Sequence, residues 1–409
     1  MRTLIAIFLI SVTSVSAPAQ SPFLSTTLGT RAGAFSARSM ALGHTYVTDQ
    51  PGPAALLGNP ATLSAQETQW LVDVSADVTR VKETRKYPVY DSFDAVLIYN
   101  NYAINDHLYS KLDGGASWRA IDGAEGSLVL AAASYSAYRF DYRYHEEVRD
   151  RYASGGIQDR RLGENRIDVD GDLRCLSLGA AVSESESFAW GIGMALYYGE
   201  WTNTTGVYYA DPDSTNRVER VDYRPRGLPT EMNLGALWAI NQRVSMGTRI
   251  LLPMGFEVES NPESQETFGV RYPARYTLGV RYRPQSEFRP ILLLEGEIIT
   301  YRDVSNDLDN TFEIRAGAEQ EVVAGTPVRL GFVYANAPED KDRATSLFTA
   351  GIGFHLQRLT GDFAVELGKV NTTSPDLFPQ SLYGDTDRSD NDKVETALFR
   401  GMITLRYAL

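Results

Sequence analysis

Apolar and polar residues alternate one by one along most of the chain after residue 69, and this period of two constrains the fold more than any other feature. In WLVDVSADVTRV, the residues Trp70, Val72, Val74, Ala76 and Val78 share one face, and the other face is polar. Successive side chains of a β-strand point to opposite faces, so the pattern predicts a strand with one apolar side. That side either packs inside a sandwich or faces lipid around a membrane barrel, and one strand leaves both possibilities open.

The connections between such runs alternate between short and long. Short polar connectors occur at 122–126, 183–187, 240–243, 284–290, 321–327 and 356–362. Longer polar segments lie between them, at 146–164, 206–228, 258–266, 304–309, 337–344 and 372–394. Outer-membrane barrels have tight turns at one rim and longer loops at the other, whereas Greek-key sandwiches are not expected to alternate so regularly.

Fourteen strand-forming runs lie between these connectors: 70–83, 93–119, 127–145, 165–182, 188–205, 229–239, 244–257, 267–283, 291–303, 310–320, 328–336, 345–355, 363–371 and 396–409. Many of them exceed the roughly 9–11 residues that a tilted strand needs to cross a bilayer. We therefore predict an all-β fold, a transmembrane antiparallel β-barrel of about 14 strands at 67–409, with strands that extend beyond the membrane on the outer side. A barrel of this kind is surrounded by lipid, so outer-membrane lipids are expected partners.

The sequence contains no apolar run long enough for a transmembrane helix after the first 19 residues. After residue 19 no run of 18 apolar residues occurs, so a spanning helix is not expected, and a closed barrel is the other structure that satisfies its backbone in lipid. Cys175 is the only cysteine, and we interpret it as a packing residue rather than a reactive thiol.

Aromatic residues are frequent, with 23 Tyr, 16 Phe and 5 Trp. Aromatic side chains gather at the headgroup level of membrane barrels, although general β-propensity also enriches them in strands. We interpret as girdle residues those near predicted strand ends: Tyr135, Tyr138, Tyr142, Tyr197, Tyr198, Trp201, Tyr272 and Tyr276.

The first 19 residues predict export. Arg2 gives a positive start, an apolar run follows from Leu4 to Val15, and Ala17-Pro18-Ala19 supplies the small residues of a cleavage site. We predict a signal peptide at 1–19, a mature chain from Gln20 and a location in the bacterial outer membrane. The net charge of −13 argues against nucleic acid as a partner.

The C-terminal residues LFRGMITLRYAL also alternate. The face with Ile403, Leu405, Tyr407 and Leu409 resembles the C-terminal strand signal that the barrel-assembly machinery of Gram-negative bacteria reads, with Leu409 where Phe is most common. The barrel-assembly machinery is therefore an expected partner during biogenesis.

The segment RSMALGHTYVTDQPGPAALLGNPATLSA, residues 38–65, breaks the alternation and is rich in Gly, Ala and Pro. It resembles the N-terminal signature of the FadL/PorV-type outer-membrane proteins, which include long-chain fatty-acid transporters, hydrocarbon channels and the shuttle component of the type IX secretion system. The residues that carry the resemblance are Met40-Ala41-Leu42-Gly43, Pro53-Ala54-Ala55-Leu56 and Asn59-Pro60-Ala61. The sequence departs from the signature at His44, where a second Gly is usual, and at Thr62, where Gly is usual.

The resemblance implies that residues 20–66 form a plug, or hatch, inside the barrel. A lumen of fourteen strands is too wide for its own side chains to fill, which agrees with this implication. Leu42, Gly43, Asn59, Pro60 and Ala61 are then the structural plug motif. We expect the apolar plug residues that face the lumen to contact a ligand, and the candidates are Phe35, Met40, Leu42 and Tyr46.

No catalytic or metal-binding pattern is present in the sequence. G-x-S-x-G and H-E-x-x-H elements are absent, and the four His residues match no ligand spacing. The acidic loop at 384–395 could bind Ca²⁺ through Asp385, Asp387, Asp390 and Asp392, but it does not match an EF-hand. We predict no enzyme activity, no cofactor and no metal.

Two functions remain open at this stage. The first is passage of a hydrophobic, fatty-acid-like or hydrocarbon-like molecule, released past a moving plug or sideways through the wall. The alternative is a PorV-like component of a secretion system that binds other proteins through its long loops, without small-molecule transport.

Overall fold

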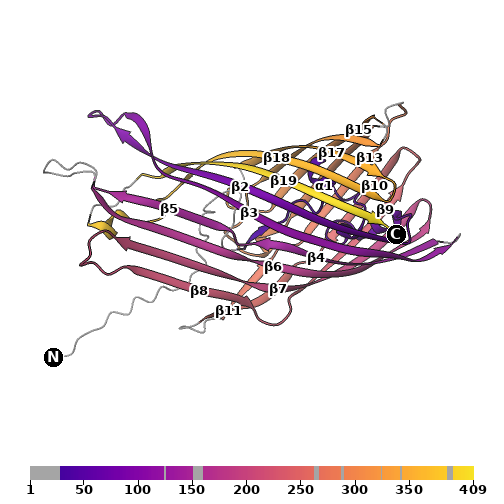
Figure 1. Ribbon diagram of the computed structural model, residues 1–409, viewed down its shortest axis with the longest axis horizontal. Helices are drawn as coiled ribbons and strands as arrows, with labels where there is room; N and C mark the ends of the chain where they lie inside the picture. The colour runs from indigo at the N-terminus through magenta and orange to yellow at the C-terminus, as the bar shows by residue number, and fades with distance from the viewer. Residues whose placement is uncertain are drawn as a thin grey trace.

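Fourteen antiparallel strands close into a single barrel in the computed structural model (Figure 1). The structure describes residues 28–123, 126–150, 160–261, 267–286, 290–323, 325–340, 343–384 and 390–409. The predicted signal peptide therefore lies outside the described residues. The first and last strands close the barrel through a ladder that runs from Lys393 opposite Lys86 to Ala408 opposite Leu71.

Within the described residues, the wall contains eighteen strand segments. They are β2 (Trp70–Tyr90), β3 (Val96–Gly123), β4 (Gly126–Arg139), β5 (Tyr142–Arg149), β6 (Arg161–Ser185), β7 (Phe188–Tyr209), β8 (Arg217–Pro225), β9 (Thr230–Ala239), β10 (Val244–Leu251), β11 (Met254–Asn261), β12 (Thr267–Tyr272), β13 (Arg275–Tyr282), β14 (Ile291–Ile299), β15 (Thr311–Val323), β16 (Thr326–Asn336), β17 (Ala344–Leu356), β18 (Leu359–Ser374) and β19 (Asp392–Ala408). Short 3₁₀ turns η3 (Tyr301–Asp303) and η4 (Gln380–Tyr383) lie in the connections.

Four of the fourteen strands are interrupted, which accounts for the larger number of segments. The pairs β4 and β5, β8 and β9, β10 and β11, and β12 and β13 each continue one strand, because both members pair with the same strand on at least one side. The prediction of an antiparallel barrel of about 14 strands is confirmed.

One predicted loop is wrong. The segment 206–228 was expected to be a long polar connection, but β7 continues to Tyr209 and β8 occupies Arg217–Pro225. These polar residues form a hairpin that extends β7 and its partner beyond the apolar part of the wall. Polar side chains on both faces of a strand hide its period of two, so the sequence pattern resembled a loop.

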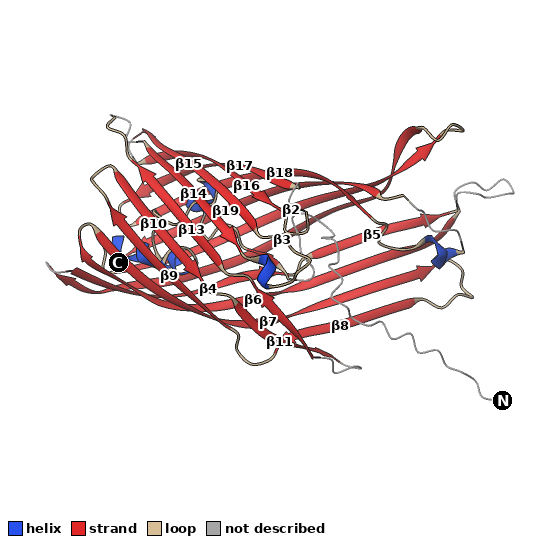
Figure 2. Ribbon diagram, turned by 180° about the vertical axis from the view of Figure 1, so that it is seen from behind, coloured by secondary structure: helices blue, strands red, loops and turns tan. Residues whose placement is uncertain are grey.

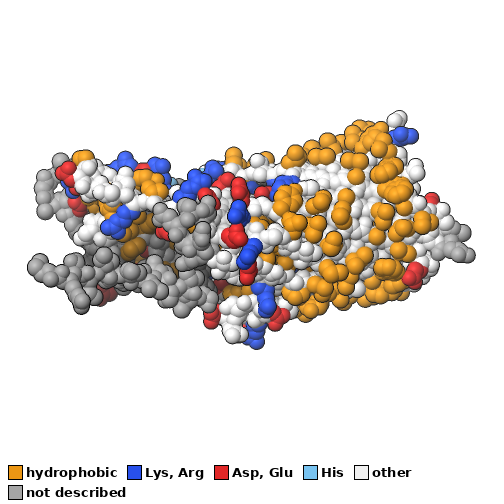
Figure 3. All heavy atoms as spheres, turned by 90° about the horizontal axis from the view of Figure 1, so that it is seen from below, with side chains coloured by type: hydrophobic (Ala, Val, Ile, Leu, Met, Phe, Trp, Pro, Cys, Tyr) orange, Lys and Arg blue, Asp and Glu red, His pale blue; other side chains and the backbone are white. Residues whose placement is uncertain are grey.

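The outer surface carries a band of exposed apolar side chains on every side of the described barrel, which includes Trp190, Leu278, Leu330, Phe363 and Leu405. Figure 3 shows this band around one part of the molecule, with charged side chains along its border. Such a band faces acyl chains in a membrane barrel. Strands β2, β3, β6 and β7, with 21 to 28 residues, extend well beyond it, whereas β14 has only 9.

Residues 28–66 lie inside the barrel, and they include three of the described helical turns (Figure 2). They comprise β1 (Thr30–Arg31), α1 (Ala37–Ala41), η1 (Pro53–Leu56) and η2 (Pro60–Ala65). Ser36 caps α1 by accepting a hydrogen bond from the Ser39 amide at 3.2 Å. In the described part of the chain, none of the helices has the length and apolar character that a membrane span requires.

Candidate functional site

Glycines on the inner wall let the plug backbone lie directly against the strands. A Cβ atom added to Gly317 would lie 2.5 Å from the carbonyl oxygen of Leu42, and one added to Gly191 would lie 2.6 Å from the amide nitrogen of Ala61. No side chain larger than hydrogen fits at such distances. The other wall glycines in contact with the plug are Gly115, Gly179, Gly193, Gly235, Gly247, Gly279, Gly331 and Gly351.

The predicted plug motif makes specific contacts with this wall. The Asn59 amide group donates to the carbonyl oxygens of Val47 at 2.7 Å and Ala236 at 3.0 Å, and its oxygen accepts from the Ala61 amide. Pro60 occupies the first turn of η2, where a missing N–H costs nothing. The Asn-Pro-Ala element therefore joins two plug turns to β9.

Gly43 adopts a backbone conformation that other residues rarely take. Its φ angle of +66° lies in the left-handed region that favours glycine, and its amide donates to the Thr349 hydroxyl at 3.1 Å. Leu42 precedes it with its own backbone against Gly317. The Leu-Gly pair thus turns the chain at the point where α1 ends against β15–β17.

The four candidate ligand residues are all buried in contacts of the plug. Met40 packs in an apolar cluster with Ala364 and Met402, and Leu42 contacts the wall. Phe35 lies against the ring of Tyr46, with 5.6 Å between the ring centroids. None of these four side chains lines the lumen cavity described below.

Buried charges on one side of the lumen hold the plug. Two guanidinium groups contact the Tyr46 ring, with the Cζ atoms of Arg249 and Arg315 at 5.3 Å and 4.9 Å from its centroid. Its hydroxyl donates to Glu297 at 2.6 Å, and Arg315 pairs with the same carboxylate at 2.7 Å. Glu295 accepts from the amide of Tyr46 at 2.8 Å.

A second group of charges continues this side toward the short-turn rim. Arg38 of α1 pairs with Asp49 of the plug at 3.1 Å and with Glu319 of β15 at 3.2 Å. Arg329 of β16 joins Glu319 at 2.5 Å and Asp362 of β18 at 2.7 Å. Breaking a buried charge pair of this kind costs several kcal/mol, so the plug core is firmly seated.

The opposite side of the lumen is aromatic. Tyr138 stacks on Tyr272 with 4.0 Å between centroids, and Phe140 stacks on Trp201 at 4.2 Å. The same apolar cluster contains Phe35, Tyr46, Tyr135, Tyr142, Tyr144, Tyr197, Met254, Val258 and Phe378. Phe35 and Tyr46 belong to the plug. We call the other members of this cluster, on β4, β5, β7, β11 and β12 and at Phe140 and Phe378 in the connections, the aromatic stack.

The aromatic stack corrects the interpretation of the girdle. Of the eight aromatic residues assigned to headgroup level, only Tyr198 and Tyr276 are exposed on the outer surface. The others are buried in the lumen: Tyr135, Tyr138, Tyr142, Tyr197, Trp201 and Tyr272. Tyr138 turns inward because a β-bulge shifts the β4 register between Ser136 and Tyr138, and a bulge leaves no clear trace in a period of two.

The wall beside the aromatic stack is incompletely paired. The ladder between β3 and β4 ends at Gly114 opposite Ser134. Beyond that pair, the described residues of β3 share no ladder with β4 or β5. Side chains bridge the interval instead, since the amide of Ser136 donates to Asp113 at 2.9 Å and that of His145 donates to Asn105 at 2.8 Å.

The start of the described plug occupies the β4 edge that β3 leaves. Thr30 and Arg31 of β1 pair with Arg139 and Tyr138, and the Ala32 amide donates to the carbonyl oxygen of Ala137 at 3.0 Å. We call residues 28–33 the latch. It joins the plug, the aromatic stack and the interrupted wall.

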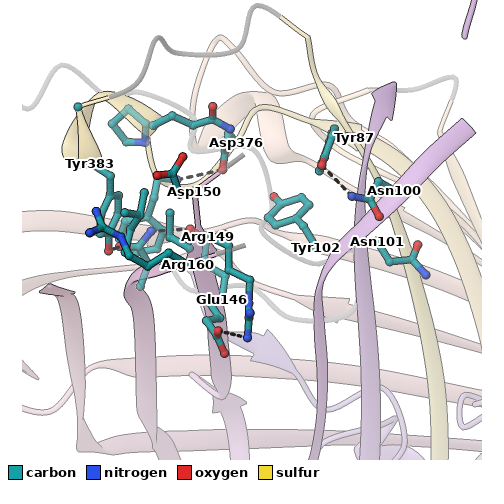
Figure 4. A pocket seen from close by; sticks show the side chains of 18 residues that line it. Tyr87, Asn100, Asn101, Tyr102, Glu146, Arg149, Asp150, Arg160, Asp376 and Tyr383 are labelled. Atoms are coloured by element: carbon teal, nitrogen blue, oxygen red, sulfur yellow. Dashed lines mark hydrogen bonds and ion pairs between the residues drawn. The ribbon is translucent and has the colours of Figure 1, made fainter. Parts of the chain in front are cut away.

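Two cavities lie on either side of the aromatic stack. The inner one, of about 380 Å³, is lined by the latch, by Tyr109 and Lys111 of β3, and by Arg139 and Asp141 beside the interrupted wall. The outer one, of about 680 Å³, opens among the long strands and is shown in Figure 4. Phe378 lines this vestibule and stacks on Tyr144, so the aromatic stack extends to the vestibule floor.

Polar groups surround the vestibule. The amide group of Asn100 donates to the Tyr87 hydroxyl at 2.7 Å, and the Tyr383 hydroxyl donates to the side-chain oxygen of Asn165 at 2.8 Å. Asn165 donates in turn to Glu146 at 2.5 Å. Burial raises the pKa of the Glu146 carboxyl, although hydrogen bonds from Tyr144 and Asn165 act in the opposite direction.

The possible calcium loop falls partly outside the described residues, which exclude Asp385 and Asp387. Asp392 lies inside the barrel, where it accepts a hydrogen bond from Tyr102 at 2.5 Å and faces Arg85 at 3.6 Å. Within the described ranges, no group of three or more His, Cys, Asp or Glu side chains is arranged to hold a metal ion.

Comparison with known proteins gives matches among solved structures. No protein-family model and no curated protein matches the chain. A FadL homologue of Pseudomonas aeruginosa aligns at 11% identity with a TM-score of 0.63, over 93% of this chain and 99% of the homologue. The toluene transporters TodX of P. putida and TbuX of Ralstonia pickettii align at 13% and 12% identity, with TM-scores of 0.59 and 0.58, each over 92% of this chain and 99% of the transporter.

Proposed function

We propose that this chain, which has the fold of FadL-type outer-membrane barrels, takes up hydrophobic small molecules across the outer membrane. The aromatic stack is the observation that carries the proposal. It extends from Phe378 at the vestibule to Tyr138 at the latch. Its side chains therefore form an apolar path from the vestibule to the interrupted wall. Ligand sites for such molecules are lined mainly by apolar and aromatic side chains.

The similar proteins suggest the class of molecule. TodX and TbuX are described as toluene transporters, and CymD as a monoaromatic hydrocarbon channel. Stacked rings favour flat aromatic guests through offset and edge-to-face contacts. Hydrocarbons and fatty-acid-like molecules are therefore the substrates to test first. Export through residues 1–19 and insertion by the barrel-assembly machinery are part of this proposal.

The route is proposed to leave the lumen sideways. The plug core is fastened by buried charges, whereas the latch is a two-residue ladder beside a wall interval that only side chains bridge. A molecule that passes the stack reaches the inner cavity, displaces the latch and leaves between β3 and β4. Of the two predicted modes of release, the structure thus favours the lateral one, with the latch as the gate.

A reversible lock tests this route. Thr30 and Arg139 are direct partners in an antiparallel ladder, where Cα atoms lie about 4.5–5.5 Å apart, within the range for a disulfide. Cys175 is the only natural cysteine and is buried, so the variant Thr30→Cys/Arg139→Cys forms the designed bond. Uptake of radiolabelled toluene and oleate is measured in cells before and after oxidation.

We expect oxidation to reduce uptake at least tenfold and reduction to restore it. The single variants Thr30→Cys and Arg139→Cys control for loss of the native side chains and should not respond to oxidant. Equal uptake of both probes by the oxidised and reduced double variant would contradict the latch, and equal uptake by cells with and without the protein would contradict transport. The PorV-like secretion function stays a prediction.

A further inference from the structure

A patch of basic side chains lies on the outside of the barrel, directly beyond the apolar band. Its cations come from three neighbouring strands, β2, β18 and β19, and they are Arg80, Lys82, Lys86, Lys369 and Lys393. Two carboxylates, Asp106 and Glu395, lie among them. We call these residues the basic patch. Its positive balance contrasts with a chain whose net charge is −13.

Strand register places the centre of the patch in one row. Lys369 lies opposite Ala397, Ala397 lies opposite Lys82, and Lys82 lies opposite Asp106. Neighbouring strands are about 4.8 Å apart, so the two lysines stand roughly 10 Å from each other across a small residue. The short side chain of Ala397 leaves a gap between the two ammonium groups.

That gap is the head of an open groove on the lipid-facing wall. The groove, of about 610 Å³, is lined by the two lysines, by Ala397 and by the outward-facing apolar side chains of Phe348, Leu367 and Phe399 on the membrane side. Phe348, Leu367 and Phe399 are exposed on the outer surface. The groove therefore joins a cationic end to an apolar end.

The cationic end lies at the headgroup level. Tyr407, near the opposite end of the apolar face of β19, is ten residues from Ala397. At roughly 3.3 Å per residue and a tilt of about 40°, ten residues rise about 25 Å, which is the height of the apolar band of an outer-membrane barrel. The β19 chain leaves the bilayer beside Ala397, where lipid phosphates are found.

The two central lysines are the cations that face the groove with the weakest pairing. Lys393 lies farther out, with its Nζ 4.7 Å from the centroid of the Tyr99 ring. Arg80 is engaged by Asp106 through two hydrogen bonds, at 2.7 Å and 2.5 Å, and Lys86 is engaged by Glu395 at 2.7 Å. Lys369 is 3.9 Å from Glu395, at the limit of an ion pair. Lys82 makes no ion pair or hydrogen bond with any residue in the described ranges.

We propose that this groove binds a phosphorylated, multiply acylated lipid of the outer leaflet. A phosphate group lies between Lys82 and Lys369, and an acyl chain lies over Leu367 and Phe399. Each lysine near a membrane surface attracts anionic lipid by a modest amount, and the apolar floor adds burial of the chain. The proposal concerns the outer face and is independent of transport through the lumen.

The opposite side of the barrel provides a matched comparison. Its exposed extension on β8 and β11 carries Arg224 and Arg226, which are paired with Glu259 and Glu257 at 3.0 Å each. Both arginines on this side are paired with carboxylates, and its described residues offer no pair of lysines across a small residue.

Native mass spectrometry of the purified barrel tests the site. The probe is bisphosphorylated lipid A added to the protein in detergent, and the same lipid without phosphates is the control ligand. Removing two cations with Lys82→Gln/Lys369→Gln should weaken lipid A binding roughly thirtyfold. The control Arg224→Gln/Arg226→Gln, which removes two exposed cations elsewhere, should leave binding within about threefold.

A charge-preserving variant separates a built site from diffuse attraction. Ala397→Trp fills the gap between the lysines and keeps both charges, so it should also weaken lipid A binding, by about tenfold. Phosphate-free lipid should bind at least tenfold more weakly than lipid A to the natural chain. Equal binding of both lipids, equal effects of the two double variants, or unchanged binding by Ala397→Trp would overturn the proposal.

Discussion

The two sides of the lumen hold the same segment of chain by different physics. On the side of β13–β18, carboxylates and guanidinium groups contact the plug backbone and the Tyr46 ring. On the side of β4–β7 and β11–β12, aromatic rings stack on each other and on the latch, and the described ladder to the plug has two residue pairs.

This difference indicates that the charged side holds the plug rigidly, whereas the aromatic side can rearrange. Buried charge pairs have specific geometry and leave uncompensated charge when they are broken, so a plug held by them moves as a unit or not at all. Aromatic contacts are less directional, and an apolar guest can replace one ring contact by another. Under the proposed function, the lumen would combine a plug that prevents leakage with a flank that admits an apolar molecule.

The largest change in stability is expected from a substitution on the charged side of the lumen. Arg315→Ala removes an ion-pair partner of Glu297 and a cation–π contact with the Tyr46 ring, which should lower the free energy of unfolding by about 4 kcal/mol. The unseated plug should also raise ion conductance in planar bilayers. Arg224→Ala, at an exposed pair, is the control and should change stability by less than about 1 kcal/mol. A closed channel in Arg315→Ala would contradict the role of the charged side.

A slightly smaller loss of stability is expected from a substitution on the aromatic side. Trp201→Ala removes the ring that stacks on Phe140, which should cost about 3 kcal/mol through lost burial and a residual cavity. Because the plug is held from the other side, ion conductance should stay at the natural level. If Trp201→Ala leaks ions as Arg315→Ala does, the two sides are not separate in function.

The wall glycines give a third test. A methyl group at Gly331 would overlap the amide of Gly43, so Gly331→Ala should destabilise the folded barrel by about 2 kcal/mol. Gly401 has no atom within 4 Å of an added Cβ, and Gly401→Ala should therefore be neutral or slightly stabilising. Unfolding in urea, followed by tryptophan fluorescence, compares the two variants, and equal midpoints would exclude tight seating at Gly331.

The smallest effect concerns the vestibule. Burial raises the pKa of Glu146 above its usual 4.5, so the folded protein binds more protons than the unfolded chain between those two pKa values. Stability contributed by this group therefore falls as the pH rises through that window. Glu146→Gln lacks this dependence, and its Tm should exceed the natural value by on the order of 1 °C at pH 8 and match it at pH 4. The opposite order would contradict the pKa direction.

Much of the barrel could be predicted from the sequence because lipid and lumen impose alternation. The runs around Trp70–Val78 and Gly401–Tyr407 gave both the strands and the face that meets lipid. The same parity separates Tyr197 from Tyr198, since Trp190, Ile192 and Met194 mark the even positions of β7 as the outer face. Attention to parity would have placed Tyr197 and Trp201 in the lumen.

The aromatic stack and the latch could not be predicted in the same way. Tyr138 reaches the lumen through a bulge, and β1 finds its partner in a strand edge that exists only because β3 and β4 part at Gly114. The charged side was missed for another reason: polar residues such as Glu295 and Arg315 alternate like any lumen-facing residues. Their pairing with the plug depends on contacts between distant strands.

A second disulfide tests most directly the claim that the plug core stays in place while molecules pass. A Cβ on Gly279 would lie 3.4 Å from the Cβ of Val47, close to disulfide geometry, and 2.9 Å from the Cγ of Glu295, whose side chain has to shift. Val47→Cys/Gly279→Cys then ties the core to β13, and the reduced variant controls for the shift of Glu295. We predict that toluene uptake by the oxidised variant stays within about twofold of that by the reduced variant. Loss of uptake on oxidation, with recovery on reduction, would show that the core must move and would contradict the account.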